Sequence, residues 1–569
     1  MVGRYVSVPF HGRTVRGYVL GATDDVPERT LPVRRVLSSV SLFGVADLEL
    51  YRWMAERYVA PLATVIGRAH PPRVAGVEAR PPEPPGVLPT VDPPAVLRAY
   101  HGGESVLDAS AGGQGAFLFR PLPDHEAGAC VEAVAACVRA GRDAVVVVPE
   151  AEPLPETARQ VADAFGDTAL VHVGGSERAR YRAWLDVLAG RYRVVIGTRP
   201  AVFAPLPNLG LVWVNREAHP AHHEDRAPYH HVREVAMARA RLRRGAAVLA
   251  AHCPSAAAVA AADRGELAVV RAPRSAERAA APLVETIRPE RQEVGSRLGA
   301  ALRRADGAFL LVSRRGYGVA RVCRTCGAPA RCAVCGGSIT VAEGVARCVV
   351  CASPGACAVC GGRRFGVDPR GTEHVEEQAA RLTGGAVARV DEGDEALPPG
   401  AGRVVVGTAA AVKDFGPLRV GLVAVLDADR ARRRPGLAAT EQTLATWMEA
   451  AVWAGPKGAG GRVIVQTEEP ADASVQALVR WDPWHFHRRE AERRAEAGFP
   501  PGYPVFRLRG GAELAEAVAE IEPAHLLSTS LGDETVCLVT MRPDAVSAFR
   551  DWVRRNEGLV TRVEAEPQL

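Results

Sequence analysis

Lysine is almost absent from the sequence, because only two of its 70 basic residues are lysine, Lys413 and Lys457. A phosphate-binding P-loop has the pattern G-x4-G-K-[ST], in which the lysine contacts the β- and γ-phosphates and the hydroxyl binds Mg²⁺. Lys413 stands in VKDF and Lys457 in GPKGA, outside any such pattern. The sequence therefore excludes an ordinary P-loop anywhere in the chain.

Long apolar runs and charge of one sign are also missing. No run approaches the roughly 20 apolar residues of a membrane span, and Met1 to Pro9 does not read as a secretory signal. The formal net charge is only +5 over 569 residues, and 24% of the residues are charged. This composition excludes a disordered chain and decides nothing about nucleic acid. We expect a cytoplasmic globular protein without membrane contact, with several domains because one core seldom exceeds about 250–300 residues.

Cysteine, in contrast, is concentrated in one short stretch. Two C-x2-C pairs place four thiolates around one tetrahedral ion and leave no open position for catalysis. Glycines after three of the pairs suit the tight turns that let amides donate to ligand sulfurs. The spacing predicts two structural zinc ions. The four pairs are Cys323/Cys326, Cys332/Cys335, Cys348/Cys351 and Cys357/Cys360.

Disulfides and iron–sulfur clusters are the alternative interpretations of this stretch. A chain without an export signal should keep its thiols reduced, and iron–sulfur ligation usually has other spacings, so zinc is favoured. The other four cysteines stand among apolar residues and are predicted to be buried without a role; they are Cys130, Cys137, Cys253 and Cys537.

The pattern of apolar residues divides the N-terminal part of the chain into a β-hairpin segment and a helical segment. Arg4 to Gly21 alternates apolar and polar residues as a β-hairpin does, and we expect it to be the end of a small barrel that is either truncated or preceded by further residues upstream of the assigned start codon. Leu31 to Pro72 has the helical periodicity of a compact unit of winged-helix size. The proline-dense segment from Pro71 to Pro94 then marks a domain boundary.

Two sets of short β-branched runs follow, and helical segments separate the runs. This alternation predicts βαβ units and parallel sheets with helices on both faces, arranged as two tandem lobes of a helicase-type motor. A charged helix from Trp481 to Ala497 and a small α+β domain are expected after Thr467. The expected strands are Ala144–Val148, Ala169–Val173, Val194–Ile196, Leu209–Val214 and Ala247–Ala250, then Phe309–Val312, Ala386–Val390, Val404–Val406, Leu422–Leu426 and Val463–Gln466.

Several motifs together resemble one family, the PriA primosomal proteins that restart stalled replication forks. They occur in the family's order over nearly the whole chain: GTRPAVFAPLPNLGL (197–211), APYHHVREVA (227–236), SRRGYG (313–318), the eight cysteines, GTEHVEE (371–377), VLDAD (425–429) and EAGFPP (496–501). The resemblance implies a multidomain α/β protein with two RecA-like lobes. The implied domains are a barrel remnant that binds a DNA 3′ end (1–26), a winged helix (27–90), lobe 1 (91–275), lobe 2 (276–480), an inserted two-zinc module (320–366) and a C-terminal α+β domain (481–569).

The resemblance also implies how the cysteines pair and what the protein binds. One zinc would be held by Cys323, Cys326, Cys357 and Cys360, and an inner zinc by Cys332, Cys335, Cys348 and Cys351. The implied partners are branched or forked DNA, single-stranded DNA, primosome proteins and single-stranded-DNA-binding protein, and the expected state is a monomer.

The family is normally an ATP-driven helicase, and its nucleotide motifs are degraded in this sequence. We place the P-loop at the segment Ala109, Ser110, Ala111, Gly112, Gly113, Gln114, Gly115, Ala116, in which Gly115 replaces the lysine and Ala116 replaces the Mg²⁺ hydroxyl. The acidic Mg²⁺ motif after Leu209–Val214 reads Asn215, Arg216, Glu217, so only one carboxylate remains.

Two further motifs are lost as well. The family's arginine fingers, worth several orders of magnitude in phosphoryl transfer, are replaced in the segment 449–456 by Trp453 and Pro456. The stretch that couples ATP to DNA reads AAHCPS at 250–255. We therefore expect no catalytic residues and no use of ATP or Mg²⁺, as in the actinobacterial branch of the family.

Three hypotheses remain open. The first is a replication-restart protein that binds forked DNA and helps assemble the primosome without helicase activity. The second is an ATP-dependent 3′→5′ helicase with a rearranged nucleotide site, in which Arg120 or Arg199 would replace the lysine. The third is a zinc-ribbon interaction scaffold without a DNA role.

Some other residues suggest sites on their own. Five histidines, at 219, 222, 223, 230 and 231, stand in a polar loop and are expected to be solvated rather than to bind metal. Asp427 and Asp429 follow a predicted strand, where they lie at the functional edge of the sheet or cap a helix. The basic runs Arg430–Arg434 and Arg488–Arg494 are candidates for contacts to DNA phosphates.

Overall fold

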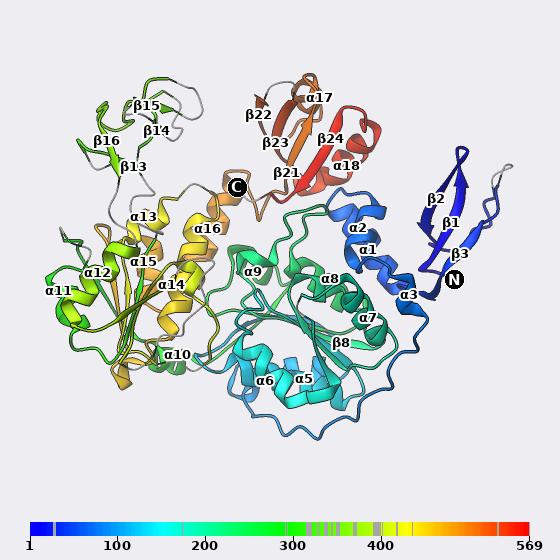
Figure 1. Ribbon diagram of the computed structural model, residues 1–569, viewed down its shortest axis with the longest axis horizontal. Helices are drawn as coiled ribbons and strands as arrows, with labels where there is room; N and C mark the ends of the chain where they lie inside the picture. The colour runs from blue at the N-terminus through cyan, green and yellow to red at the C-terminus, as the bar shows by residue number, and fades with distance from the viewer. Residues whose placement is uncertain are drawn as a thin grey trace. The chain divides into compact units, whose positions relative to one another are not determined.

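The computed structural model divides into two compact units (Figure 1). The first comprises Met1–Arg278, Gly436–Ala445 and Asp482–Leu569, and the second comprises Ala279–Pro435 and Thr446–Trp481. The structure describes residues 1–569 except 27–29, 173, 291, 293, 314–320, 327, 329, 335–338, 343–344, 349–352, 368–371, 391–399, 401, 417–418, 435, 532–533 and 568–569.

The first unit begins with a three-stranded antiparallel sheet of order β2-β1-β3. The strands β1 (Arg4–Phe10) and β2 (Arg13–Tyr18) form the predicted hairpin. The sheet extends past residue 26, because β3 (Arg35–Ser41) pairs with β1 through Val6 and Val36. The prediction of helix from Leu31 is wrong for this segment, where the β-branched residues of RVLSSVS favour a strand.

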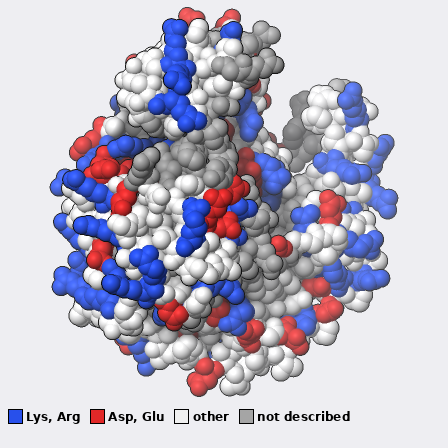
Figure 2. Space-filling model, turned by 60° about the vertical axis from the view of Figure 1, so that its left-hand side comes forward, with Lys and Arg blue, Asp and Glu red and all other residues white. Residues whose placement is uncertain are grey.

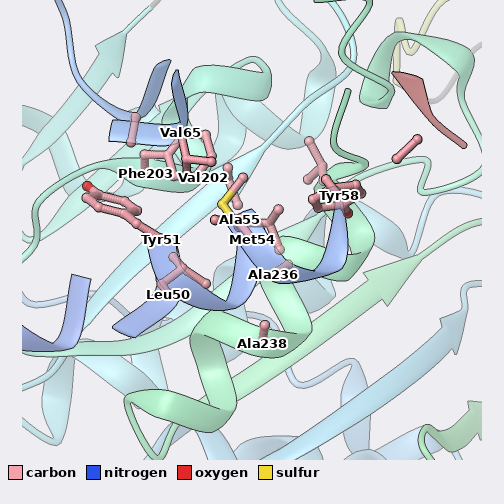
Figure 3. Packing of buried hydrophobic residues seen from close by; sticks show 14 of the residues in the cluster. Leu50, Tyr51, Met54, Ala55, Tyr58, Val65, Val202, Phe203, Ala236 and Ala238 are labelled. Carbon is pink, nitrogen blue, oxygen red and sulfur yellow. The ribbon is translucent and has the colours of Figure 1, made fainter. Parts of the chain in front are cut away.

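Three helices follow this sheet: α1 (Val45–Arg57), α2 (Leu62–Ala69) and α3 (Ala75–Glu78). The apolar face of α1 packs on the first α/β lobe, where Tyr51 and Met54 lie against Phe203 and Ala236 (Figure 3). Buried side chains on α1 recur at intervals of three and four residues, as the helical periodicity predicts. The N-terminal helices and the first lobe therefore share one hydrophobic core.

The first lobe is a seven-stranded sheet of order β10-β4-β9-β8-β5-β7-β6, and every pairing in it is parallel. Its central strands are buried on both faces because helices cover both, as expected for near-continuous apolar runs. The elements are α4 (Gly103–Ser110), β4 (Gly115–Arg120), α5 (Glu126–Arg139), β5 (Asp143–Val147), α6 (Glu156–Phe165), β6 (Ala169–His172), α7 (Glu177–Leu188), β7 (Val194–Gly197), β8 (Leu209–Val214), α8 (Val232–Leu242), β9 (Ala246–Ala250), α9 (Ala256–Asp263), β10 (Ala268–Arg271) and α10 (Arg274–Ala280).

The second unit contains a six-stranded sheet of order β11-β20-β19-β12-β18-β17, again with parallel pairings. Two small antiparallel pairs, β13 with β16 and β14 with β15, form the cysteine-rich insertion. The elements are β11 (Leu283–Ile287), α11 (Ser296–Leu302), β12 (Ala308–Leu311), β13 (Arg321–Cys323), β14 (Ile339–Ala342), β15 (Val345–Cys348), β16 (Phe365–Val367), α12 (Thr372–Thr383), β17 (Val387–Val390), β18 (Val404–Gly407), β19 (Leu422–Val425), α13 (Ala428–Arg432), α14 (Ala439–Val452, which begins in the first unit), β20 (Arg462–Gln466) and α15 (Ala473–Val479).

The C-terminal segment returns to the first unit with a four-stranded antiparallel sheet of order β22-β23-β21-β24. The predicted charged helix is α16, and α17 and α18 accompany the sheet, so this segment is α+β as expected. The elements are α16 (Trp484–Glu496), β21 (Val505–Gly510), α17 (Leu514–Ala519), β22 (His525–Leu531), β23 (Glu534–Thr540), α18 (Val546–Arg555) and β24 (Val560–Ala565).

The predicted α/β class and the two tandem parallel-sheet lobes are confirmed. Among the described residues, no helix combines the length and apolar character needed to span a bilayer. Basic and acidic side chains are interspersed over the described part of the face in Figure 2, which agrees with the small net charge.

Candidate functional site

The first and fourth cysteine pairs lie together in the second unit. Pairing of β13 with β16 sets Cys323 opposite Phe365 and so brings the two pairs close. All four Sγ atoms lie within 4.8 Å of one another. The Sγ atoms of Cys323 and Cys360 are 3.5 Å apart, and those of Cys326 and Cys357 are 3.7 Å apart. A tetrahedral zinc site has sulfur–sulfur edges of about 3.8 Å, so this cluster could hold one metal ion.

The local backbone suits this cluster. The Val359 N–H donates to the Cys357 Sγ at 3.4 Å, and the Cys357 N–H donates to the Gly362 carbonyl at 2.9 Å. A Cβ on Gly362 would lie 3.1 Å from the Cys323 Sγ and 3.2 Å from the Cys360 Sγ. The predicted role of the glycines therefore applies to Gly362, which lets the chain pass close to two sulfurs.

The thiols of this cluster titrate unequally. The Cys326 N–H stabilises the thiolate of Cys323 and lowers its pKa to about 6. At Cys360 the Gly362 N–H acts in the same direction, but hydrogen bonds with Cys326 and Cys323 prevail and raise the pKa to about 12. The crowded thiols share protons, and a bound divalent cation would favour the thiolate form at every position.

Replacing Gly362 by alanine should weaken metal binding at least about tenfold, because the new methyl group crowds two ligand sulfurs. The measurement is competition with a chromophoric zinc chelator. Gly385→Ala is the matched control, since no atom lies within 4 Å of its added Cβ. Equal zinc affinity of the two variants would contradict the role given to Gly362.

The second cysteine set is only partly within the described residues. Cys332 and Cys348 are buried, whereas Cys335 and Cys351 lie outside the described residues. The Val334 N–H donates to the Cys332 Sγ at 3.4 Å, which repeats the contact between Val359 and Cys357. The second metal site remains a prediction.

The structure corrects the position assigned to the degraded P-loop. A phosphate cradle follows the carboxyl end of a strand and opens the next helix. Residues Ala109–Ala116 instead comprise the end of α4, a turn and the first residues of β4, at the amino end of that strand. The topologically correct loop is Pro121–His125, between β4 and α5. Its sequence, PLPDH, has no glycine, lysine, serine or threonine.

A carboxylate stands at the start of the helix that follows this loop. Glu126 begins α5 and is 7% exposed. The Asn215 side chain donates to Glu126 at 2.6 Å and to the Thr157 hydroxyl at 3.4 Å. The helix dipole stabilises a negative charge at the N-terminus of a helix, and here a carboxylate takes the place that a phosphate would occupy. The carboxylate also repels phosphate oxygens. The loop and the acidic motif therefore contact each other through an internal acid–amide pair.

The other two residues of the degraded acidic motif also have internal partners. Arg216 pairs with Glu150 at 2.8 Å. Glu217 is fully buried, accepts the Ser255 N–H at 2.6 Å and pairs with Arg233 at 3.2 Å. Burial raises the pKa of Glu217, while Arg233 opposes the rise. The one carboxylate that the motif retains is therefore used to connect β8 with the turn before α9.

The two arginines considered as substitutes for the lysine are paired with other groups. Arg120 is 5% exposed, pairs with Glu277 at 3.0 Å and donates to the His252 carbonyl at 3.1 Å. Arg199 donates to the Ala221 carbonyl at 2.7 Å and lies 3.6 Å from Glu224. Neither arrangement supports the hypothesis of a rearranged nucleotide site.

The position of a lost arginine finger belongs to the core of the second unit. Trp453 is 4% exposed, and its ring lies 4.9 Å from Phe309 and 5.9 Å from Phe415 between centroids. The tryptophan stabilises the fold there and offers no cation to a transition state.

Asp427 and Asp429 do not form a site of their own. Asp429 accepts hydrogen bonds from the Thr467 hydroxyl at 2.5 Å and from the Glu468 N–H at 2.8 Å. Asp427 pairs with Arg430 at 3.1 Å. Asp429 therefore fixes the loop after β20, and Asp427 pairs with an arginine of α13, the helix that it precedes.

Several arginines of the two basic runs form ion pairs within the protein. Arg432 pairs with Asp429, Glu469 and Asp472 and is buried. In α16, Arg488 pairs with Asp263 at 2.7 Å, and Arg494 pairs with Glu441 at 2.9 Å. Sequence alone could not reveal these pairs, because each partner except Asp429 lies more than 30 residues away.

The histidine loop is buried rather than solvated, which corrects the sequence-based expectation for most of it. His222 is fully buried and contacts the Asn215 carbonyl at 2.8 Å, and His223 contacts the Glu566 carbonyl at 2.9 Å. Burial lowers the pKa of His222 to about 4 and that of His230 to about 3. The apolar Tyr229 and Val232 beside these histidines were the available signal of burial.

These histidines predict that acid weakens the first unit. They are neutral when folded, while in the unfolded chain they bind protons below about pH 6.5. The free energy of unfolding should therefore be unaffected above that pH and fall as the pH drops toward 4, by up to about 1.4 kcal/mol per pH unit for each histidine. Neither ring nitrogen of His230 has a hydrogen-bond partner among the described residues, and Phe203 lies beside the ring, so His230→Phe should reduce this pH dependence. Urea unfolding of the wild type and of His230→Phe at pH 7.5 and 5.5 measures the pH dependence of the free energy of unfolding. An equal pH dependence of the two proteins would contradict the assignment of His230 as a buried, neutral histidine.

The fold and the site define a class: a protein with two parallel α/β lobes of helicase type, a cysteine-rich insertion in the second lobe and no recognisable phosphate loop. Residues 1–71 match the family model described as the 3′DNA-binding domain (3′BD) of PriA.

Curated relatives identify the family. The protein named "Probable replication restart protein PriA" of Mycobacterium tuberculosis (strain CDC 1551 / Oshkosh) is 33% identical over 586 residues, covering 97% of this chain and 89% of that protein. The replication restart protein PriA of Treponema pallidum is 28% identical over 554 residues, covering 89% of this chain and 82% of that protein. The chain belongs to the PriA family of replication restart proteins.

Solved structures give weaker likenesses. RecG bound to a three-way DNA junction has a TM-score of 0.40 at 12% identity, covering 79% of this chain and 52% of RecG. S. cerevisiae Dbp5 bound to RNA and ADP BeF3 has a TM-score of 0.37 at 10% identity, covering 66% of this chain and 84% of Dbp5. TM-scores below 0.5 assign no property to this chain.

Proposed function

We propose that the protein is a replication restart factor that binds branched or forked DNA and helps assemble the primosome without hydrolysing ATP. Membership of the PriA family and the match to a 3′DNA-binding domain support the DNA role. The observation that carries the loss of ATP hydrolysis is the pair Glu126–Asn215, at the place where phosphate and Mg²⁺ would otherwise be bound.

The network around the degraded motifs supports this reading. An ATP-driven motor needs groups that are free to respond to the nucleotide. Here Glu217, Arg233 and Ser255 are bonded to one another. We infer that the first lobe has become a rigid scaffold that holds the DNA-binding parts.

The remaining parts of the proposal follow the family resemblance. Two Zn²⁺ ions would stabilise the insertion, one at the cluster of Cys323 and one at Cys332, Cys335, Cys348 and Cys351. The partners would be forked and single-stranded DNA, primosome proteins and single-stranded-DNA-binding protein. A monomeric cytoplasmic protein with a winged helix within residues 27–90 completes the proposal.

The test is DNA binding without nucleotide, measured by fluorescence anisotropy on a fork with a 3′ end at the branch and on linear duplex of the same length. We expect tighter binding to the fork and no change when Mg·ATP is added. Equal affinity for the two DNAs would refute the proposal. It would leave the interaction-scaffold alternative, which the 3′DNA-binding domain match otherwise disfavours.

A further inference from the structure

The cysteine-rich insertion carries a basic pocket beside the predicted metal cluster. Its volume is about 410 Å³, and it is lined by Arg324, Val341, Ala346, Arg363, Arg364 and Phe365. This volume is within the roughly 300–1,000 Å³ of pockets that hold small ligands. A pocket of this size accommodates one nucleotide and is too small for a duplex.

Pairing of β13 with β16 builds the pocket. The Arg324 N–H donates to the Arg364 carbonyl at 2.8 Å. This bond continues the antiparallel pairing of β13 with β16 and places the backbones of Arg324 and Arg364 next to each other. Gly366 lets the Arg324 side chain lie close to the β16 backbone, because an added Cβ would come within 1.8 Å of its Nε. The position of Arg324 is therefore prepared by the fold before any ligand binds.

Within the described part of the module, the arginines of this pocket have no carboxylate partner. Among the described residues, no ion pair or side-chain hydrogen bond involves Arg324, Arg363 or Arg364, in contrast to the paired arginines of α13 and α16. Residues 320–366 contain one acidic residue, Glu343, and six arginines: Arg321, Arg324, Arg331, Arg347, Arg363 and Arg364.

Neutralisation of the thiolates is the plainest alternative role for these arginines. A filled four-thiolate zinc site carries a formal charge of about −2, which nearby cations would offset. The sulfur contacts given for the described cysteines, however, are with backbone N–H groups, with Ser353 and with other cysteines. Arg324, Arg363 and Arg364 line the pocket.

We propose that this pocket binds one nucleotide of single-stranded DNA, an inference that rests on the proposed DNA function. Guanidinium groups bind phosphate oxygens in paired hydrogen bonds, and an aromatic ring that lines the pocket, here the partly buried Phe365, can stack on a base. Arg363, Arg364 and Phe365 supply these two features from consecutive positions. An acidic peptide would use the arginines alone and would not need an aromatic side chain at the pocket.

The experiment compares full-length, zinc-loaded variants with a fluorescein-labelled oligothymidylate between 50 and 200 mM salt. Arg363→Ala/Arg364→Ala should weaken binding and reduce the slope of log K against log salt by about 1.4, which is about 0.7 for each lost phosphate contact on a single strand. Phe365→Leu keeps an apolar side chain in β16 and should weaken binding about 5- to 150-fold with the slope unchanged.

Arg347→Ala is the matched control. Arg347 is an exposed arginine of the same module, next to Ala346 in β15, and side chains of successive strand residues point to opposite faces. The Arg347→Ala variant should bind the oligonucleotide with the affinity and salt dependence of the wild type. Equal zinc content of all variants shows that the module has folded, and an oligonucleotide carrying 5-iodouracil should cross-link to the segment 363–365.

Three results would overturn the inference. The double arginine variant could match Arg347→Ala in affinity and slope, or the cross-link could map to another segment. A glutamate-rich peptide could bind the wild type but not the double arginine variant, which would make an acidic protein segment the ligand. Fork binding by the wild type is measured in parallel, so its absence would refute the proposed function, whereas normal single-strand binding by the variants would refute only this pocket.

Discussion

Replacing Arg233 by alanine should lower the free energy of unfolding of the first unit by about 3–5 kcal/mol, because it leaves the buried carboxylate of Glu217 without its cation. Glu217 is fully buried and shares Ser255 with Arg233, so no solvent replaces the lost charge. Urea denaturation monitored by tryptophan fluorescence measures the change.

The pH dependence of this variant has a defined sign. Burial raises the pKa of Glu217, and loss of Arg233 removes the main opposing interaction. A carboxyl group with a raised folded-state pKa stabilises the fold below its unfolded pKa and loses that contribution as the pH rises. The deficit of Arg233→Ala should therefore be larger at pH 8 than at pH 5.

Two controls accompany this experiment. Arg264→Ala removes an arginine of the same lobe whose pair with Glu266 is about half exposed, and it should cost less than about 1 kcal/mol. The double variant Glu217→Gln/Arg233→Met removes both charges and should recover most of the loss. If Arg233→Ala were as stable as Arg264→Ala, the bonds among Glu217, Arg233 and Ser255 would not stabilise the first lobe.

The second large effect concerns the predicted metal cluster. Cys357→Ser removes one of four thiolates and should reduce the zinc content from two ions per chain to one. Structural zinc sites contribute an apparent folding free energy of about 10–16 kcal/mol in isolated modules, so the insertion should become sensitive to proteases. Elemental analysis and limited proteolysis measure these two results.

Cys137→Ala is the control, because Cys137 is a buried cysteine of the first lobe outside the insertion. Its zinc content should equal that of the wild type. A wild-type content of one ion would contradict the proposed inner site, and an unchanged content in Cys357→Ser would contradict the outer one.

The fold could be predicted from the sequence to a large extent, and the reasons are local. Runs such as Val194–Ile196 and Leu422–Leu426 are short, β-branched and separated by helical segments, which specifies parallel strands without knowledge of their order. The strand β3 was missed because its apolar residues also fit a helical period. Pairing with β1 decides between helix and strand for this segment, and such pairing depends on the tertiary structure.

The candidate site was predictable only in part. The grouping of Cys323, Cys326, Cys357 and Cys360 was implied by the family resemblance, and spacing alone left it open. The P-loop was misplaced because the glycines at 112, 113 and 115 resemble a phosphate loop, and only the position of β4 shows that they precede the strand. The partners of Glu126 and Glu217 lie 89 and 16 residues away, and no periodicity predicts such pairs.

The central claim is that the first lobe has exchanged nucleotide chemistry for internal bonds. It is tested most directly by nucleotide binding and hydrolysis on zinc-loaded protein, with and without forked DNA, using a fluorescent ATP analogue and phosphate release. The account predicts fork binding, no saturable binding of the analogue and no phosphate release above that of buffer. Hydrolysis that is stimulated by the fork and abolished by Arg120→Ala would contradict it.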